Sequence, residues 1–382
     1  MPSNNIVNSP FSTSIAPGRG EVVLSILPPG IPSLSTLSYR YPLKLLSRVP
    51  GCELDSKFPA SATTPVHLYL LSYGGGLLPG DHIDVTIKLR PRSRLIVTTP
   101  QGSTKIYKTE SQAKRGDVAR RGTNVSKLDR SQQIINVELS TESAILYLPD
   151  PSVPFERSKY EQIQRFTLLQ GERSPQPVTD DIEAKRAHQA SLCLLDWVTE
   201  GRSARGEKWS FDLWEGRNEI WARDCRTSKS RLLVRDTVTL CKEGSTIPDE
   251  NGTPRRDDNL RRRQAYLSTA PLSIASRTAS HGVLGTLILY GPVFESLSTF
   301  FMEKFSSLPR IGTRLSSSPD SEAKSKSKDS DITWTAARVR SGFVIVKFGA
   351  PDFESAKRWL GSIFREEGSV EKEFGDEALS YL

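Results

Sequence analysis

The stretch LSYGGGLLPGDHIDVTIKL, Leu71–Leu89, decides the fold, because a glycine-rich turn leads directly into a run where apolar and polar residues alternate. Ile83, Val85, Ile87 and Leu89 are the apolar members, and this period of two is typical of a strand with one buried face. Glycine permits the backbone angles that a tight turn requires. The stretch therefore predicts a turn followed by a half-buried β-strand.

Strand signals of the same kind recur through most of the chain as short apolar or alternating runs, bounded mainly by Gly, Pro, Asp or Ser. The hairpin turn that we expect in this series contains Gly216 and Asn218, which tolerate turn backbone angles. It would join the two predicted strands that begin at Trp209 and Glu219. The predicted strands are Val66–Leu71, Ile83–Leu89, Arg94–Thr99, Ile134–Leu139, Ala144–Leu148, Gln162–Leu169, Trp209–Trp214, Glu219–Arg223, Arg231–Val234, Thr237–Leu240, Val283–Tyr290 and Gly342–Phe348.

Three helices are predicted where apolar residues recur at helical spacing. Ala187–Thr199 carries one apolar stripe and is followed by Gly201, a common stop signal. The second helix runs from Pro292 through Phe305, since proline suits a first helical turn. The third follows Asp352, which suits an N-cap.

Together these signals predict a mainly β fold. We expect a single large domain of stacked β-strands, either β-helix-like or a two-layer sheet, with two or three α-helices. Residues 1–38 are expected to be a flexible N-terminal extension, residues 39–366 the β domain, and residues 367–382 a C-terminal tail. Polar, charge-rich insertions are predicted at about 110–132, 171–185, 242–263 and 315–330.

The composition is that of a globular, moderately basic protein. With 382 residues and 36% hydrophobic content, the chain has enough apolar material for a core. Lys and Arg number 52 against 44 Asp and Glu, a surplus of +8. Much of it lies in the runs 114–121, 255–263 and 324–328, which contain no aromatic residue. Solvated loops are therefore expected, an acidic protein partner is the second interpretation, and a nucleic-acid-binding protein that uses the basic runs is a further alternative.

The cysteines and the termini indicate the compartment. Cys52, Cys193, Cys225 and Cys241 form no C-x-x-C pair, so neither a zinc cage nor a disulfide framework is predicted. The N-terminus has no charged start followed by an apolar core, and no run of about 18 apolar residues could span a bilayer. A cytoplasmic protein without membrane contact is therefore expected.

Motifs for tight phosphate or metal binding are absent from the sequence. The spacing from Gly75 to Gly80 matches a phosphate loop, but Asp81 and His82 stand where that loop needs Lys and Ser or Thr. There is no G-x-S-x-G elbow, no H-x-H or H-E-x-x-H motif and no cysteine pair. A tight, prebuilt transition-metal site is therefore not expected.

Two carboxylate groupings have the oxygen atoms to hold a hydrated divalent ion loosely: Asp81 with His82, and Glu200 with Glu207. A structural interpretation stands beside this one, in which Asp81 accepts backbone N–H bonds at its turn and the glutamates pair with neighbouring arginines. A third interpretation is a hydrolase-like enzyme that uses Asp81 and Glu207 as paired carboxylates for acid–base chemistry.

Four blocks occur in a fixed order: YGGGLLPGD (Tyr73–Asp81), TTPQGSTKIY (Thr98–Tyr107), LYLPDPSVPF (Leu146–Phe155) and DWVTEGRSARGE (Asp196–Glu207). With the strand and helix of GFVIVKFGAPDFESAKRWL (Gly342–Leu360), they resemble the urease accessory protein D family, UreD, called UreH in some bacteria. The long insertions and extended N-terminus are more similar to those of eukaryotic members.

The resemblance implies a non-enzymatic chaperone that scaffolds an accessory-protein complex and helps to deliver nickel to apo-urease. Its implied partners are a UreF-like protein, a UreG-like GTPase and apo-urease, with no nucleic acid or membrane. It implies an all-β body with a passage for nickel in transit and no tightly bound cofactor. By this analogy Asp81, Glu200, Glu207 and His82 would contact the moving ion. A structural role falls to Gly74, Gly75, Gly76, Gly80, Gly102, Lys105, Pro149, Pro151, Arg202 and Arg205.

Overall fold

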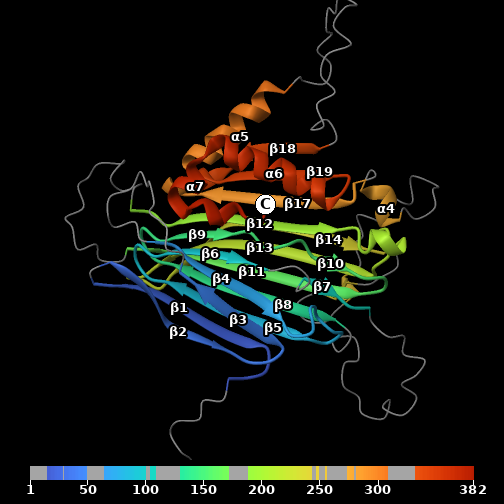
Figure 1. The fold of residues 1–382 in the computed structure, drawn as a ribbon, viewed down its shortest axis with the longest axis horizontal. Coiled ribbons are helices and arrows are strands. Elements are labelled where there is room, and N and C mark those ends of the chain that lie inside the picture. The colour runs from blue at the N-terminus through green and yellow to red at the C-terminus, as the bar shows by residue number, and fades with distance from the viewer. Residues whose placement is uncertain are drawn as a thin grey trace, which may run out of the picture.

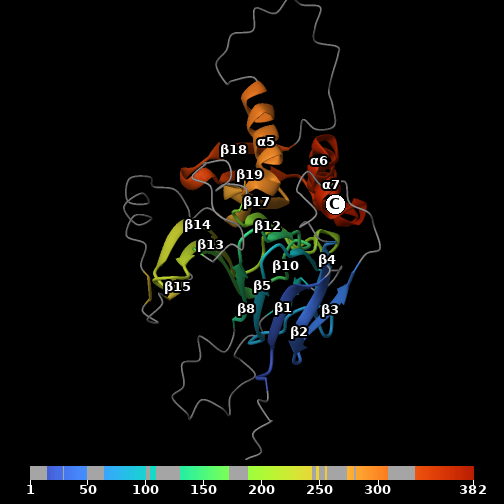
Figure 2. The same cartoon turned by 90° about the vertical axis from the view of Figure 1, so that its left-hand side faces the viewer.

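The strands form two large sheets that face each other (Figures 1 and 2). The computed structural model describes residues 15–28, 30–49, 64–99, 104–108, 130–171, 188–242, 247–248, 254–255, 273–278, 281–308 and 332–382. Sheet A contains, in spatial order, β14 (Ser230–Cys241), β13 (Leu213–Asp224), β11 (Lys159–Gln170), β8 (Ser131–Leu139), β5 (His82–Leu89), β1 (Arg19–Leu27) and β2 (Ile31–Tyr39). Sheet B contains β18 (Thr333–Arg338), β19 (Val344–Ala350), β17 (Val283–Tyr290), β12 (Ser191–Thr199), β9 (Ala144–Tyr147), β6 (Arg94–Thr98), β4 (Val66–Ser72) and β3 (Leu43–Arg48).

The central strands form a coil. From β4 to β13 the chain crosses from sheet B to sheet A and back, and each strand pairs in parallel with the neighbour one full circuit away. Two short pairs are also present, β7 (Lys105–Ile106) with β10 (Val153–Pro154), and β15 (Ile247–Pro248) with β16 (Pro254–Arg255). The predicted mainly β, β-helix-like fold of stacked strands is therefore confirmed. In Figure 1 the stack runs from the blue N-terminal strands to the red C-terminal elements.

Alternating side chains build two apolar layers. Ile83, Val85, Ile87 and Leu89 of β5 are buried in the layer between the sheets, as the period of two predicts. The second layer lies on the other face of sheet B, under α5 (Glu295–Ser307), α6 (Phe353–Glu367) and α7 (Ser369–Phe374). Sheet B is therefore buried on both faces along its centre.

Two of the three predicted helices are confirmed. A 3-10 turn at Pro292–Phe294 leads into α5. The Asp352 carboxylate caps α6 by accepting a hydrogen bond from the Ser355 backbone N–H at 2.8 Å. A short helix, α4 (Ile274–Arg277), was not expected from the sequence. No described helix combines the length and apolarity that a membrane span needs.

The predicted helix Ala187–Thr199 is wrong, because Ser191–Thr199 is strand β12. All nine of its residues are buried, with Leu194 facing sheet A and Trp197 facing the helices. A strand buried on both faces has a continuous apolar run, which spacing alone does not distinguish from a helix.

The predicted hairpin centred on Gly216 and Asn218 is also wrong. Leu213–Asp224 is one continuous strand, and so is Ser230–Cys241, where two short strands were expected. Gly216 lies in the middle of β13, where a Cβ would come within 2.5 Å of the Trp214 ring and 2.9 Å of Asp196 Oδ2. The glycine makes room for those side chains instead of forming a turn.

The ends of the chain differ from expectation as well. Within the predicted flexible extension, residues 19–27 and 31–38 lie in strands β1 and β2, and β1 pairs with β5. Residues 367–382, expected as a tail, contribute buried side chains such as Phe374 and Leu379 to the layer under the helices. The predicted insertions lie largely outside the described residues, with the exception of short segments at their edges and of the paired strands β15 and β16 within 242–263.

A buried ion pair fastens the C-terminal segment to sheet B. Arg94 of β6 donates to the Glu373 carboxylate at 2.6 Å and to the Glu373 carbonyl oxygen at 2.6 Å. Both side chains are at most 4% exposed. Such a pair leaves an uncompensated charge in the interior when one partner is removed.

We expect Glu373→Ala to lower the free energy of unfolding by about 3–5 kcal/mol, measured by urea denaturation. The exposed pair Arg48–Glu377 joins the same segment to β3 and is the matched control, since Glu377→Ala should cost less than about 1 kcal/mol. The double variant Arg94→Met/Glu373→Leu should recover most of the loss. Equal losses of unfolding free energy for Glu373→Ala and Glu377→Ala would contradict this account.

Candidate functional site

The four sequence blocks come together along one side of the stack, where strands β4, β6, β9 and β12 of sheet B end. They lie in the connections from β4 to β5, β6 to β8, β9 to β11 and β12 to β13, which all run from sheet B to sheet A. Because the coil is parallel, these connections lie side by side, and we call this surface the motif end. Backbone hydrogen bonds join successive connections: Leu77 N to Lys105 O at 2.8 Å, Val153 N to Thr104 O at 3.0 Å, and Thr199 N to Ser152 O at 2.9 Å.

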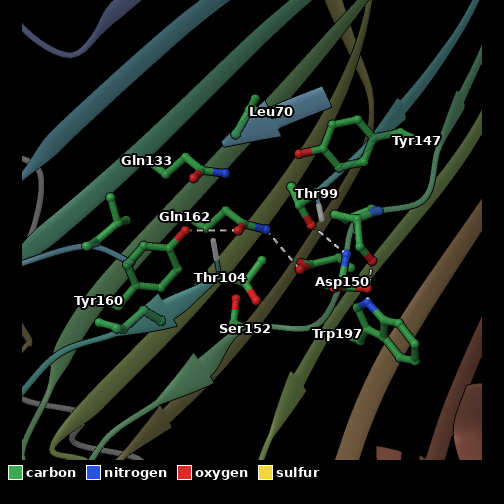
Figure 3. Close-up of a pocket in the computed structure, with 14 residues that line it drawn as sticks. Leu70, Thr99, Thr104, Gln133, Tyr147, Asp150, Ser152, Tyr160, Gln162 and Trp197 are labelled. Atoms are coloured by element: carbon green, nitrogen blue, oxygen red, sulfur yellow. Dashed lines mark hydrogen bonds between the residues drawn. The ribbon is translucent and has the colours of Figure 1, made fainter. Parts of the chain in front are cut away.

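A small polar cavity lies beneath the motif end, between the two sheets (Figure 3). Its volume of about 20 Å³ is the space of roughly one water molecule. Nine of its fourteen lining residues have oxygen-bearing side chains, which is unusual for the interior of a β-structure. These polar lining residues are Thr99, Thr104, Gln133, Tyr147, Asp150, Ser152, Tyr160, Gln162 and Asp196.

Hydrogen bonds organise one side of this cavity into a chain that crosses between the sheets. The Tyr160 hydroxyl donates to Gln162 Oε1 at 3.0 Å, and Gln162 Nε2 donates to Asp196 Oδ1 at 2.9 Å (Figure 3). Asn218 Nδ2 donates to the other carboxylate oxygen, Oδ2, at 2.8 Å. Asp196 on β12 of sheet B thus accepts one bond from β11 and one from β13 of sheet A.

Two acidic residues line this small space, and their carboxyl groups are hard to ionise. Burial raises the pKa of Asp196 to about 6, with Asn218 and Gln162 opposing the shift and the Asp236 charge adding to it. Burial also raises the pKa of Asp150 to about 6, against the attraction of Lys357. At neutral pH both groups are mostly ionised, so the wall of the cavity carries negative charge.

The polar layer continues beyond the cavity along the inner face of sheet A. Gln164, two residues after Gln162 on β11, is fully buried, and neither its oxygen nor its nitrogen has a partner among the described residues. The same holds for Asn218 Oδ1 and Asp236 Oδ2. Nearly all buried polar atoms in proteins are hydrogen-bonded, so apolar packing does not explain these unpartnered atoms. We call the polar strip that contains Gln164, Asn218 and Asp236 the seam.

The residues predicted to contact metal lie at the motif end, but on separate connections. Asp81 Oδ2 accepts a hydrogen bond from the Leu78 backbone N–H at 2.7 Å, and His82 is the exposed first residue of β5. Glu200 and Glu207 lie on the fourth connection, with two connections between them and Asp81. Among the described residues no cluster of three or more His, Cys, Asp or Glu side chains has metal-binding geometry.

Glu207 is held by a structural ion pair. Arg202 binds its carboxylate through Nε at 3.0 Å and through a second guanidinium nitrogen, and the Glu156 backbone N–H donates to it at 3.2 Å. The hydrogen bond from Arg202 lowers the pKa of Glu207. The Arg202 guanidinium also stacks over the Phe155 ring at 3.9 Å. This geometry agrees with the alternative in which a neighbouring arginine engages the glutamate.

The glycine-rich connection has local structural uses. Gly74, Gly75 and Gly80 have positive φ angles, where other residues are strained. Gly76 has a different reason, since a Cβ there would come within 2.6 Å of the Lys105 carbonyl oxygen.

The other predicted structural residues have varied surroundings. The Pro149 carbonyl accepts a bond from Trp197 Nε1 at 2.7 Å, and Pro151 is buried. Arg205 ends an exposed 3-10 turn, Ser203–Arg205. Gly102 lies outside the described residues.

Asp150, Asp196 and the residues that bond Asp196 were not predicted as site residues. A signal for them was present, since Asp196 is the single charged residue in the apolar run SLCLLDWVT and Asp150 lies between two prolines. A charge at a buried strand position is costly and marks a special environment. The predicted helix placed Asp196 in the wrong surroundings.

A second hollow, on the outer face of sheet A, is a weaker candidate. It has a volume of about 440 Å³ and is open to solvent. Its charges largely satisfy one another: Arg165 and Arg235 both bind Glu219, at 3.3 and 3.0 Å, and Arg223 binds Glu138 at 2.7 Å. The polar cavity beneath the motif end therefore remains the best candidate site.

The raised pKa of Asp196 predicts a pH dependence of stability. Between about pH 4 and pH 6 the folded chain binds this proton more readily than the unfolded chain does, so rising pH lowers the free energy of unfolding. Asp196→Asn removes the titration. The free energy of unfolding of the variant, relative to that of wild type, should therefore increase by about 3 kcal/mol when the pH is raised from about 4 to about 7, as measured by urea denaturation. Glu303→Gln, on the exposed face of α5, is the control, and parallel curves for Asp196→Asn and wild type would contradict the prediction.

Comparison with known proteins gives a consistent family assignment. The family model described as UreD urease accessory protein matches residues 18–173 and 178–374. "Urease accessory protein 4" of Cryptococcus neoformans is 26% identical over 92% of this chain and 90% of its own length. A ureD-like urease accessory protein of Schizosaccharomyces pombe is 28% identical over 86% and 88%, and urease accessory protein D of Arabidopsis thaliana is 31% identical over 53% of each chain. The match extends over most of the described strands and helices, and the chain therefore belongs to the UreD family of urease accessory proteins.

Proposed function

We propose that this chain supports urease maturation by letting nickel pass through its polar interior while it scaffolds the accessory-protein complex. Its family is that of urease accessory proteins, whose role is to assist urease and not to catalyse a reaction of their own. The single observation that carries the nickel proposal is the oxygen-lined cavity with Asp150 and Asp196, directly beneath the motif end.

The chemistry of the cavity wall suits a cation in transit. Carboxylate, amide and hydroxyl oxygens bind Ni²⁺ far more weakly than the imidazole and thiolate ligands of tight sites. A nanomolar site would hold the ion with about 12 kcal/mol of binding free energy, which a handover would have to overcome. An oxygen-lined wall attracts the ion without retaining it.

The size of the cavity adds a constraint. With space for roughly one water molecule, it does not admit an ion with a complete hydration shell. An ion that enters must exchange part of its water for the side-chain oxygens of the wall. Asp196 and Asp150 compensate this loss with negative charge, and the unpartnered oxygens of Gln164, Asn218 and Asp236 offer further contacts along the seam.

The expected partners follow from the family and from charge. We infer that the chain works in the cytoplasm with a UreF-like protein, a UreG-like GTPase and apo-urease. The net charge of +8 favours docking on acidic surfaces, with affinity that falls as salt rises. The residues first predicted to contact the ion then lie at the entrance to the path, because they are located at the motif end. They are Asp81, His82, Glu200 and Glu207.

The test is reconstitution of urease activation from apo-urease, the other accessory proteins, Ni²⁺, bicarbonate and GTP, with or without this chain. We expect activation to depend on the chain. Asp150→Asn/Asp196→Asn should slow nickel incorporation, measured by elemental analysis of the re-isolated urease, by about tenfold or more. Both substitutions keep the shape of the side chain and remove only the charge.

The controls separate the interior path from the surface. Binding of the double variant to the UreF-like partner should equal that of wild type, and Glu303→Gln should change neither readout. Asp81→Asn and Glu207→Gln test the residues predicted from the sequence. If these two variants abolish incorporation while the Asp150/Asp196 variant is normal, the interior path is wrong.

A further inference from the structure

Exposed apolar side chains are concentrated at one end of the stack. Ten large hydrophobic residues are exposed in the described part of the chain, and nine of them lie between Leu27 and Leu78; the tenth is Leu308. This region is where both sheets end, with β2 as the edge of sheet A and β3 as the edge of sheet B. The nine residues are Leu27, Ile31, Leu37, Tyr39, Tyr41, Leu46, Val49, Tyr73 and Leu78.

Strand β2 is an uncharged edge strand, with Pro32 near its start and a bulge in its pairing with β1. Its sequence, IPSLSTLSY, has no charged residue, and it pairs only with β1. Edge strands normally carry charges that prevent further strand pairing. The other three sheet edges follow that rule: β3 has Lys44 and Arg48, β14 has Arg231, Arg235 and Asp236, and β18 has Arg338.

Beside the end of β2, three tyrosines form a fixed aromatic corner. Tyr41, Tyr73 and Tyr39 are 63%, 45% and 36% exposed, and the rings of Tyr41 and Tyr73 lie 5.7 Å apart. The backbone around them is tied down, since Gly18 N donates to Tyr41 O at 2.9 Å and Tyr73 N donates to Pro42 O at 2.8 Å. Aromatic side chains held in place before binding are typical anchors of protein interfaces.

The charge beside this corner is positive. Lys44 Nζ lies 5.7 Å from the centre of the Tyr73 ring, and Arg40 donates to the Ile15 carbonyl at 2.8 Å. Within the described residues neither cation has an ion-pair partner, whereas many other arginines do, such as Arg48 with Glu377. A second copy of this chain would bring its own net charge of +8 to the surface, so an acidic partner is favoured.

We propose that the β2 edge and the corner of Tyr39, Tyr41 and Tyr73 bind an extended, acidic segment of another protein. The segment adds as a strand to β2, its backbone satisfies the free edge, and its aromatic or aliphatic side chains cover the tyrosines. Its carboxylates approach Arg40 and Lys44. This docking site does not depend on the nickel path.

The test is selection from a phage-displayed library of random 12-residue peptides against the purified full chain. We expect enrichment of peptides with net negative charge and at least one aromatic or aliphatic side chain. Affinities of the selected peptides, measured by fluorescence anisotropy, should fall about tenfold or more for Tyr41→Ser/Tyr73→Ser. A Ser35→Glu variant places a negative charge on the β2 edge and should lower the affinities of the same peptides by a similar factor.

Leu308→Ser, which changes the exposed residue outside this region, is the matched control and should bind as wild type does. Circular dichroism and thermal melting establish that each variant is folded. Enrichment of basic peptides, or binding that survives both the tyrosine and the Ser35 changes, would overturn the proposal. So would a concentration-dependent dimer in sedimentation that is lost in Tyr41→Ser/Tyr73→Ser, since a second copy would then be the occupant.

Discussion

Burial of sheet B on both faces is the constraint on which the rest of this structure depends. Its central strands separate two apolar layers, one shared with sheet A and one shared with the C-terminal helices. Residues of β12 therefore have no solvent-facing side, and every polar atom placed there must find a partner inside the protein. The sheet makes this possible for the backbone, because the hydrogen-bonding groups of β12 pair with β9 in parallel on one side and with β17 in antiparallel fashion on the other.

Asp196 is the exception that gives the interior its chemistry. A carboxyl group on such a strand is expensive to ionise, and its raised pKa is the direct expression of that cost. The structure supplies two amide donors from the opposite sheet and leaves space at Gly216, so the charge is accommodated, and among the described residues no cation forms an ion pair with it. Glu207, by contrast, is fully engaged by Arg202. A charge left without a counter-ion inside a protein is available to a passing cation, whereas one in a bidentate pair is not.

The division of the molecule into regions follows from the coil. One side collects the four connections that carry the sequence blocks, with the polar cavity beneath them. The first strands of the stack expose an uncharged edge and an aromatic corner, and the helices cover the outer face of sheet B. Passage of an ion and attachment of a partner would then use neighbouring surfaces, because Tyr73 belongs both to the aromatic corner and to the first of the four connections.

The sequence by itself determined the kind of structure and the family. Alternation in Ile83–Leu89 and its counterparts marks strands because their period of two is a local property, and Asp352 marks the start of α6 because capping is local as well. The blocks of motif residues indicated a urease accessory protein for the same reason. Tertiary structure alone decided that Ser191–Thr199 is a strand, that Gly216 gives space to a carboxylate, and that Asp150 and Asp196, 46 positions apart in the chain, line one cavity. Those outcomes depend on which strands become neighbours and on which faces are covered, and neither is encoded in the spacing of residues within one segment.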